Sequence, residues 1–359
     1  MSGKRLKIGI VGVCRGSSLA NVFEGHPETE IIAACDLNPA VLKSFAEKHS
    51  GARTFIEYKK MLKQDLDIVV ISTPPYLHAE QSILALKEGK HVLSEVPAAV
   101  SLKECEKLTK AVEDTKRKYM MAENCNYFPV VKTIKKLVRD RRLGDIFYME
   151  SEYLHNIGEL KTDKNGNPTW RAAYHPFLYL THSTGPIISI LDEELIEVTA
   201  MQSRIATDIN KRFGVPDAVV GLFRTKRNII IKITNSFSMY RPYQLTYSIY
   251  GSKGTYESAR AKWDKDKAFF EDISNQNDMI PMETAFSSEY GLPLKHLPAL
   301  AASGGHGTSE FFMIDDFVQS ITKNTKPPID IYTAVNYTIP GICAFESITK
   351  NRAVKIPNF

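Results

Sequence analysis

Short apolar runs alternate with amphipathic stretches along the first third of the chain. Residues 6–11 are mostly apolar and β-branched, as expected for a strand buried on both faces of a parallel sheet. Similar runs occupy 30–35, 67–72, 90–95 and 119–122. Between them, helices are predicted over 17–24, 39–49, 58–63, 78–88 and 102–116. This alternation of strand and helix predicts a doubly wound parallel sheet.

The pattern changes after residue 125. One more helix is predicted over 129–142, followed by strand-like runs at 146–154, 195–205, 218–225, 228–238 and 244–250 and by helices at 309–322 and 333–349. The runs 218–225 and 228–238 are separated by hairpin spacing, which favours an antiparallel sheet. We therefore expect two domains, 1–125 and 126–359, the second an α+β domain with a mostly antiparallel sheet.

The first strand leads into a glycine-bearing turn of the kind that binds dinucleotides. Gly12 allows the chain to turn sharply, Gly16 allows the backbone to approach a pyrophosphate, and the helix that follows attracts phosphate charge. Cys14 stands where a second glycine is usual, so an ordinary strand-to-helix loop is the alternative. Asp36 ends the second strand, where a carboxylate binds the ribose hydroxyls and repels a 2′-phosphate. These features predict a Rossmann domain that binds NAD in preference to NADP.

Composition narrows the possible partners and location. The 359 residues carry 46 basic and 41 acidic side chains without a basic block, so nucleic acid is not an expected partner. The five cysteines are scattered and form no C-x-x-C pair. No apolar run is long enough for a membrane span, and no signal-peptide region precedes the first strand. We expect a soluble, cytoplasmic protein with no membrane partner.

Three segments are candidates for the chemistry opposite the cofactor. Tyr127 follows the last strand of the first domain, Tyr179 and His182 are three residues apart on one helical face, and His306 stands in a Gly-Gly-His-Gly turn before a helix. The positive end of that helix favours a neutral, proton-accepting ring at His306. Each residue, taken alone, could equally be a core aromatic, a buried histidine or part of a tight loop. A metal held by His175, His182 and His306 lacks a ligand-spaced motif, so none is expected.

Several of these segments resemble the glucose-fructose oxidoreductase/inositol dehydrogenase (Gfo/Idh/MocA) family. The resemblance rests on the Gly-Ile-Val-Gly turn ending at Gly12, on Ser72-Thr73-Pro74-Pro75 with His78, and on the segment Lys90 to Pro97. The resemblance extends over essentially the full length and implies oxidation or reduction of sugar or cyclitol carbons with NAD or NADP. It implies cofactor binding by Gly12, Val13, Cys14, Arg15, Gly16, Asp36, Thr73, Pro74, His78, Glu95 and Asn124. It also implies that 126–359 binds substrate and forms a homodimer or homotetramer.

The chain departs from this family at one position. The usual motif is Glu-Lys-Pro, whose lysine orients the nicotinamide and substrate, but Val96 stands in its place and cannot transfer a proton. A narrower set of motifs, Asn124 to Tyr127, Tyr179 to His182 and Gly304 to Gly307, is similar to a branch containing NAD-dependent glycoside hydrolases. In that branch Tyr127, Tyr179, His182 and His306 match active-site positions.

Three functions therefore remain open. The first is an NAD-dependent oxidoreductase acting on a carbohydrate or cyclitol hydroxyl, with His182 exchanging the hydroxyl proton and Tyr179 assisting. The second is a glycoside hydrolase with tightly bound NAD, which oxidises C3 transiently so that the C2 proton becomes acidic. The third is a noncatalytic NAD-dependent sensor, which the loss of the lysine permits.

Overall fold

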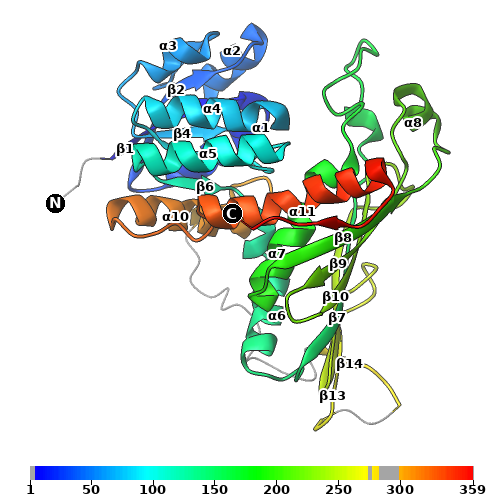
Figure 1. Cartoon of the computed structure of the whole chain (residues 1–359). Helices are drawn as coiled ribbons and strands as arrows, with labels where there is room; N and C mark the ends of the chain where they lie inside the picture. Colours follow the sequence, from blue (N-terminus) through cyan, green and yellow to red (C-terminus); the bar gives the residue numbers. More distant parts are fainter. Residues whose placement is uncertain (1–4, 274–276, 283–298, 359) are drawn as a thin grey trace. The chain divides into compact units, whose positions relative to one another are not determined.

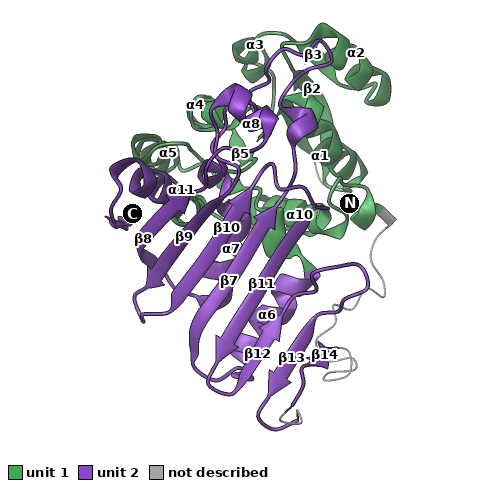
Figure 2. Cartoon of the chain, turned by 90° about the vertical axis from the view of Figure 1, so that its right-hand side faces the viewer, with its two compact units in different colours: residues 1–128, 294–338, 359 green, residues 129–293, 339–358 purple. Residues whose placement is uncertain are grey.

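The structure is a computed structural model of the chain and describes residues 5–273, 277–282 and 299–358 (Figure 1). The chain divides into two compact units, which are coloured separately in Figure 2. Unit 1 comprises 1–128 and 294–338, and unit 2 comprises 129–293 and 339–358. Domains were expected over 1–125 and 126–359, with the helices at 309–322 and 333–349 packing on the second sheet or back on the first domain. The first of these helices and the start of the second belong to unit 1.

Unit 1 contains a six-stranded parallel sheet, which confirms the predicted Rossmann architecture. Its order is β3-β2-β1-β4-β5-β6. The strands are β1 (Leu6–Val11), β2 (Thr29–Cys35), β3 (Arg53–Phe55), β4 (Ile68–Ile71), β5 (His91–Ser94) and β6 (Tyr119–Met121). The helices are α1 (Val13–Gly25), α2 (Pro39–Lys48), α3 (Tyr58–Leu62), α4 (Pro75–Lys87), α5 (Leu102–Thr115), α10 (Thr308–Thr322) and the start of α11 (Ile331–Lys350), with single turns η1 (Asn124–Tyr127) and η4 (Ala299–Ala302).

The central strands are apolar because both faces of the sheet are covered. All four residues of β4 are buried, as are the last four of β1. Helix α1 begins at Val13, four residues before its expected start, because Gly12 adopts a left-handed conformation (φ 82°) and its carbonyl already accepts the N–H of Gly16 at 3.0 Å. Helix α4 likewise begins at Pro75 rather than His78, since proline suits the first helical position.

Unit 2 is built on a nine-stranded, mostly antiparallel sheet of order β14-β13-β12-β11-β7-β10-β9-β8-β15. The strands are β7 (Ile146–Leu154), β8 (Leu195–Gln202), β9 (Val219–Thr225), β10 (Ile230–Ser236), β11 (Gln244–Gly251), β12 (Gly254–Glu257), β13 (Lys267–Phe270), β14 (Ile280–Pro281) and β15 (Val354–Lys355). The helical segments are α6 (Pro129–Arg139), η2 (Gly158–Leu160), η3 (Pro176–Tyr179), α7 (Thr181–Leu191), α8 (Asp208–Phe213) and the remainder of α11. The parallel pairing of β7 with β10 is an exception to the antiparallel pattern.

One face of this sheet carries the core, and among the residues that the structure describes the other face is open. Figure 2 views the strands with α6 and α7 behind them. Along β9 the side chains alternate strictly between buried and exposed, with Val219, Gly221 and Phe223 buried. The β9–β10 hairpin is confirmed, with Ile230 opposite Arg224. In the part of the chain that the structure describes, no helix meets the length and hydropathy of a membrane span.

Candidate functional site

The turn between β1 and α1 has the geometry that a dinucleotide requires. A Cβ atom on Gly12 would lie 2.6 Å from the Ser72 carbonyl carbon, so only glycine lets the turn lie directly against the end of β4. Asp36 receives the backbone N–H of Val13 at 3.0 Å through Oδ2 and that of Asn38 at 2.9 Å through Oδ1. The carboxylate therefore stands at the N-terminus of α1, where ribose hydroxyls reach it in dinucleotide-binding folds. These residues fit NAD.

Gly16 lies where α1 packs closely on the sheet. A Cβ atom there would lie 2.6 Å from Ile10 Cγ2 on β1, and the residue is buried. Gly16 therefore allows this packing, which is the function of the third glycine in such turns. Its expected approach to a pyrophosphate stays a prediction. Cys14, by contrast, is exposed beside it.

Arg15 is held by carboxylates from two other elements. Its Nε contacts Glu95 Oε1 at 2.8 Å, its Nη2 contacts Glu310 Oε1 at 2.7 Å, and it hydrogen bonds to Ser18. Glu95 follows β5, and Glu310 lies in the first turn of α10, where its side chain is fully buried. Three segments far apart in the sequence therefore meet at the cofactor turn.

The Gly-Gly-His-Gly turn lies on this same cluster. His306 Nδ1 is 2.8 Å from Glu310 Oε1, and 48% of the His306 side chain is exposed. Gly307 adopts φ 64° and caps α10, as expected for a glycine before a helix. The sequence placed His306 at a helix N-terminus correctly but gave no sign of its carboxylate partner.

Thr73, Pro74 and His78 form the loop between β4 and α4. Thr73 donates its hydroxyl to Gln81 at 2.6 Å, and Pro74 caps α4. The buried His78 ring faces two backbone carbonyls, Pro97 at 2.9 Å and Thr73 at 2.7 Å. Burial lowers the pKa of His78, although both carbonyls oppose this shift. The ring therefore links the two loops, and its part in cofactor binding stays a prediction.

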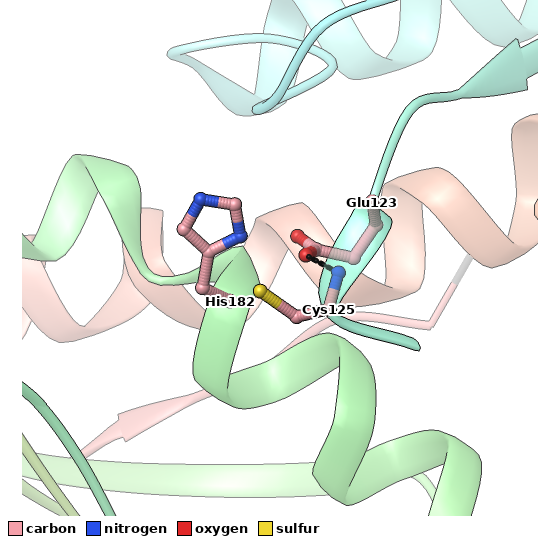
Figure 3. A group of neighbouring side chains, drawn as sticks. All are labelled: Glu123, Cys125 and His182. Atoms are coloured by element: carbon pink, nitrogen blue, oxygen red, sulfur yellow. Dashed lines mark hydrogen bonds between the residues drawn. The ribbon is translucent and has the colours of Figure 1, made fainter. Parts of the chain in front are cut away.

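The segment after β6 is buried and internally hydrogen bonded. Figure 3 shows Cys125 donating its backbone N–H to Glu123 Oε1, at 3.2 Å. Burial raises the pKa of the Cys125 thiol, and the charge of Glu123 adds to this, so the thiol stays protonated. Asn124 is also buried. Tyr127 donates its hydroxyl to Asp316 at 2.9 Å, and burial, together with this carboxylate, raises the phenol pKa. This geometry supports a structural role for Tyr127; its catalytic role stays a prediction.

Tyr179 and His182 lie in an aromatic cluster of unit 2. The His182 ring is 5.1 Å from Tyr179, edge to face, and 5.2 Å from Tyr153. The two residues were expected on one face of a single helix, but Tyr179 belongs to η3 and His182 to the first turn of α7. Figure 3 shows His182 on its helix. The Tyr247 hydroxyl donates to the His182 carbonyl at 2.9 Å and so fixes the start of the helix.

Tyr153 and Tyr243 also belong to this cluster, and neither was expected there. Tyr153 is the penultimate residue of β7, and its hydroxyl lies 3.0 Å from Nδ1 of His155. Tyr243 packs edge to face on His155 at 5.1 Å. The alternation along 146–154 placed Tyr153 on one face of a strand, but only the folded sheet brings it to α7. His175, considered as a metal ligand, is instead partnered by Gln202, and burial lowers its pKa to about 4.

Comparison with known proteins now assigns the family. Residues 6–123 match the oxidoreductase family with an NAD-binding Rossmann fold, and residues 129–359 match the C-terminal domain of glycosyl hydrolase 109. This chain belongs to the glycosyl hydrolase 109 branch of the Gfo/Idh/MocA family. The family assignment makes NAD the cofactor and makes the chain an oxidoreductase-type enzyme.

Individual relatives agree with this assignment. A glycosyl hydrolase family 109 protein of Solibacter usitatus is 28% identical, over 99% of this chain and 88% of the relative. Levoglucosan dehydrogenase, solved in complex with NADH, has a TM-score of 0.82 and 22% identity, over 99% of this chain and 100% of that one. The scyllo-inositol dehydrogenase of Lactobacillus casei has a TM-score of 0.78 and 20% identity, covering 99% of both chains. These structures confirm the expected fold.

Proposed function

We propose that this member of the glycosyl hydrolase 109 branch uses NAD to oxidise a hydroxyl of a carbohydrate or cyclitol. The observation that carries the proposal is the NAD turn of unit 1, in which Gly12 packs on β4 and Asp36 stands at the start of α1. Bound NAD supplies the hydride acceptor. The remaining task for the chain is to bind the substrate and to remove the hydroxyl proton.

His182, assisted by Tyr179, takes that proton. Val96 cannot do so, and its side chain is 3% exposed, so the family lysine has no equivalent at this position. The aromatic rings of Tyr153 and Tyr179 hold the His182 ring from two sides, which restricts its orientation. A restricted ring favours general base catalysis, which is worth about 10²–10⁴ in rate.

A second function is supported by the match of 129–359 to the glycosyl hydrolase 109 C-terminal domain. In this function the oxidation is transient. A ketone at C3 of a glycoside makes the C2 proton acidic, His306 removes it, the aglycone leaves, water adds, and the hydride returns to the sugar. The net reaction is hydrolysis without redox change.

One experiment separates the two functions. The protein is incubated with a panel of free sugars and glycosides in deuterated water, and both NADH absorbance and hydrogen exchange at C2 are measured. Net oxidation accumulates NADH in proportion to product and leaves C2 unlabelled, whereas hydrolysis labels C2 without NADH accumulation. Neither signal across the panel, together with bound NAD, contradicts both proposals and supports the sensor.

We also propose a homo-oligomer formed through the open face of the unit 2 sheet. Met201, Val220 and Leu222 expose 75%, 38% and 50% of their surface there, and they are neighbours across β8 and β9. Apolar side chains grouped in this way are typical of an interaction surface. The five free cysteines support a cytoplasmic location, which we propose as well.

A further inference from the structure

One oxygen of Glu310 serves two partners in unit 1. Glu310 Oε1 lies 2.7 Å from Arg15 Nη2 and 2.8 Å from His306 Nδ1. An ionised carboxylate only accepts hydrogen bonds, and arginine only donates. Arg15 Nη2 also lies 3.3 Å from His306 Nδ1, but the contact of Nδ1 with the carboxylate oxygen is shorter, at 2.8 Å. Because that oxygen cannot donate, Nδ1 carries the hydrogen, and Arg15 donates to Glu310 instead. The proton-accepting atom of the neutral ring is then Nε2, on the opposite side from Glu310.

The surroundings of Glu310 keep it ionised although it is buried. Burial alone raises the pKa of this carboxyl, but the hydrogen bond from His306 and the charge of Arg15 outweigh burial and leave the pKa below its ordinary value. Arg15 is itself held by Glu95 at 2.8 Å. The cluster thus contains the carboxylates of Glu95 and Glu310, the guanidinium of Arg15 and the imidazole of His306. Protonation of His306 would add a second positive charge and make the net charge of the cluster zero.

Gly304 packs against this carboxylate, and Gly305 packs against α1. A Cβ atom on Gly304 would lie 2.2 Å from Glu310 Oε2, and one on Gly305 would lie 3.2 Å from Ser18 Cβ. Neither glycine has a positive φ, so backbone conformation does not require them. Close packing of the turn against Glu310 and α1 does require them.

We propose that Glu310 is the positioning residue that makes His306 a base, by holding Nδ1–H and leaving Nε2 to accept a proton. The inference rests on the proposed function, in which His306 takes the C2 proton. Glu310 also stabilises the imidazolium that forms when Nε2 is protonated, as the carboxylate of a catalytic triad does. Arg15 keeps the carboxylate charged and in place. Since Arg15 belongs to the cofactor turn, the same contact fixes the base relative to that turn.

The test is ¹⁵N NMR of histidine-labelled protein at alkaline pH, with the His306 signal assigned by its loss in His306→Gln. The wild type is expected to show Nδ1–H and an unprotonated Nε2. Glu310→Ala is expected to shift the ring towards Nε2–H, the usual tautomer of free imidazole. An Nε2–H ring in the wild type, or no change in folded Glu310→Ala, would overturn the inference.

A second variant displaces the carboxylate without removing it. Gly304→Ala puts a methyl group against Glu310 and is expected to change the tautomer in the same direction. Gly51→Ala is the matched control, since its nearest contact would be an ordinary 3.8 Å from the Ile31 carbonyl oxygen. An unchanged tautomer in folded Gly304→Ala, or the same change in Gly51→Ala, contradicts the inference.

Activity provides a separate measurement. With any glycoside on which the wild type exchanges C2, Glu310→Ala is expected to lower kcat at least about tenfold and to change KM less than about threefold. A rise in KM of about tenfold with unchanged kcat would instead indicate a role of Glu310 in substrate binding and would overturn its positioning role. Failure of the wild type to bind NAD or to exchange C2 rejects the proposed function, whereas the tautomer result is measured without substrate or cofactor.

Discussion

Asp36 accepts one backbone N–H on each carboxylate oxygen, from Val13 and Asn38. These bonds fix the carboxylate, and each oxygen keeps a second acceptor site for a ribose hydroxyl. The position was predictable from the sequence because it depends on a local rule: an acid at the end of the second strand. The binding of Arg15 by Glu310 was not predictable, since nothing near residue 15 indicates a partner almost three hundred positions away.

Asp36→Ala is expected to reduce the preference for NAD over NADP by more than about tenfold. The reason is that repulsion between the wild-type carboxylate and a 2′-phosphate costs roughly several kcal/mol of binding free energy at low effective dielectric. Calorimetric titration of each variant with both cofactors measures the change. Asp114→Ala, whose side chain is 59% exposed on α5, is the control and should keep the preference. Tighter NADP than NAD binding by the wild type would reject the assignment.

His182→Ala is expected to lower turnover by roughly 10²–10⁴-fold and to leave NAD affinity nearly unchanged. The reason is that the base is lost while the cofactor turn in unit 1 is intact. Steady-state kinetics and calorimetry provide the two measurements. His175→Ala, in the same unit and bonded to Gln202, should keep most of its activity. Full turnover by His182→Ala would assign the base elsewhere.

At the scale of elements, the segments with a clear apolar pattern were predictable and those without one were not. The strands of unit 1 other than β3, and β7 to β11, were predicted because each has a clear apolar pattern, and β7 matches residues 146–154 at both ends. The strands β3, β12, β13, β14 and β15 were missed, since each is short and depends on pairing with a neighbour rather than on an apolar pattern of its own. The same holds for α8, a six-residue helix.

The connection from β8 to β9 depends on one carboxylate. Asp217 accepts hydrogen bonds from the backbone of Thr207 at 3.1 Å and from the side chains of Asn210 at 2.8 Å and Ser238 at 3.0 Å. Burial opposes ionisation of Asp217, but these bonds outweigh burial and lower its pKa to about 2. Asp217 thus stabilises the α8 region through its charged form.

This lowered pKa predicts a pH dependence of stability. Because the pKa of Asp217 falls from 3.8 to about 2 on folding, the stabilisation is present above pH 4 and is lost as the pH falls towards 2. The loss amounts to about 2 kcal/mol in the free energy of unfolding. Denaturant titrations between pH 4 and pH 2 should show that the free energy of unfolding depends less steeply on pH for Asp217→Asn than for the wild type. Asp208→Asn, with a 98% exposed side chain, should retain the wild-type slope; equal slopes for all three proteins would contradict the assignment.

At the scale of the molecule, the open sheet face determines the expected assembly. Leu222→Glu places a charge among Met201 and Val220, so burial of this face against a second copy would become unfavourable. Sedimentation velocity is expected to show a smaller species for Leu222→Glu than for the wild type. Leu37→Glu, at an 83% exposed leucine of unit 1, is the matched control and should not change the assembly. A monomeric wild type, or an unchanged Leu222→Glu oligomer, would exclude this interface.

Unit 1 is discontinuous in sequence, and this has a consequence for synthesis. Helix α10 is synthesised only after residues 129–293 of unit 2, yet His26 bonds to Asp315 at 3.1 Å and Glu28 to Gln319 at 2.6 Å. While the chain is emerging from a ribosome, residues 1–128 therefore lack part of their native packing until residue 338 has been added. The nucleotide-binding unit, although first in the sequence, completes its folding among the last steps, and a truncated 1–128 fragment would leave the surface beneath α10 open to aggregation.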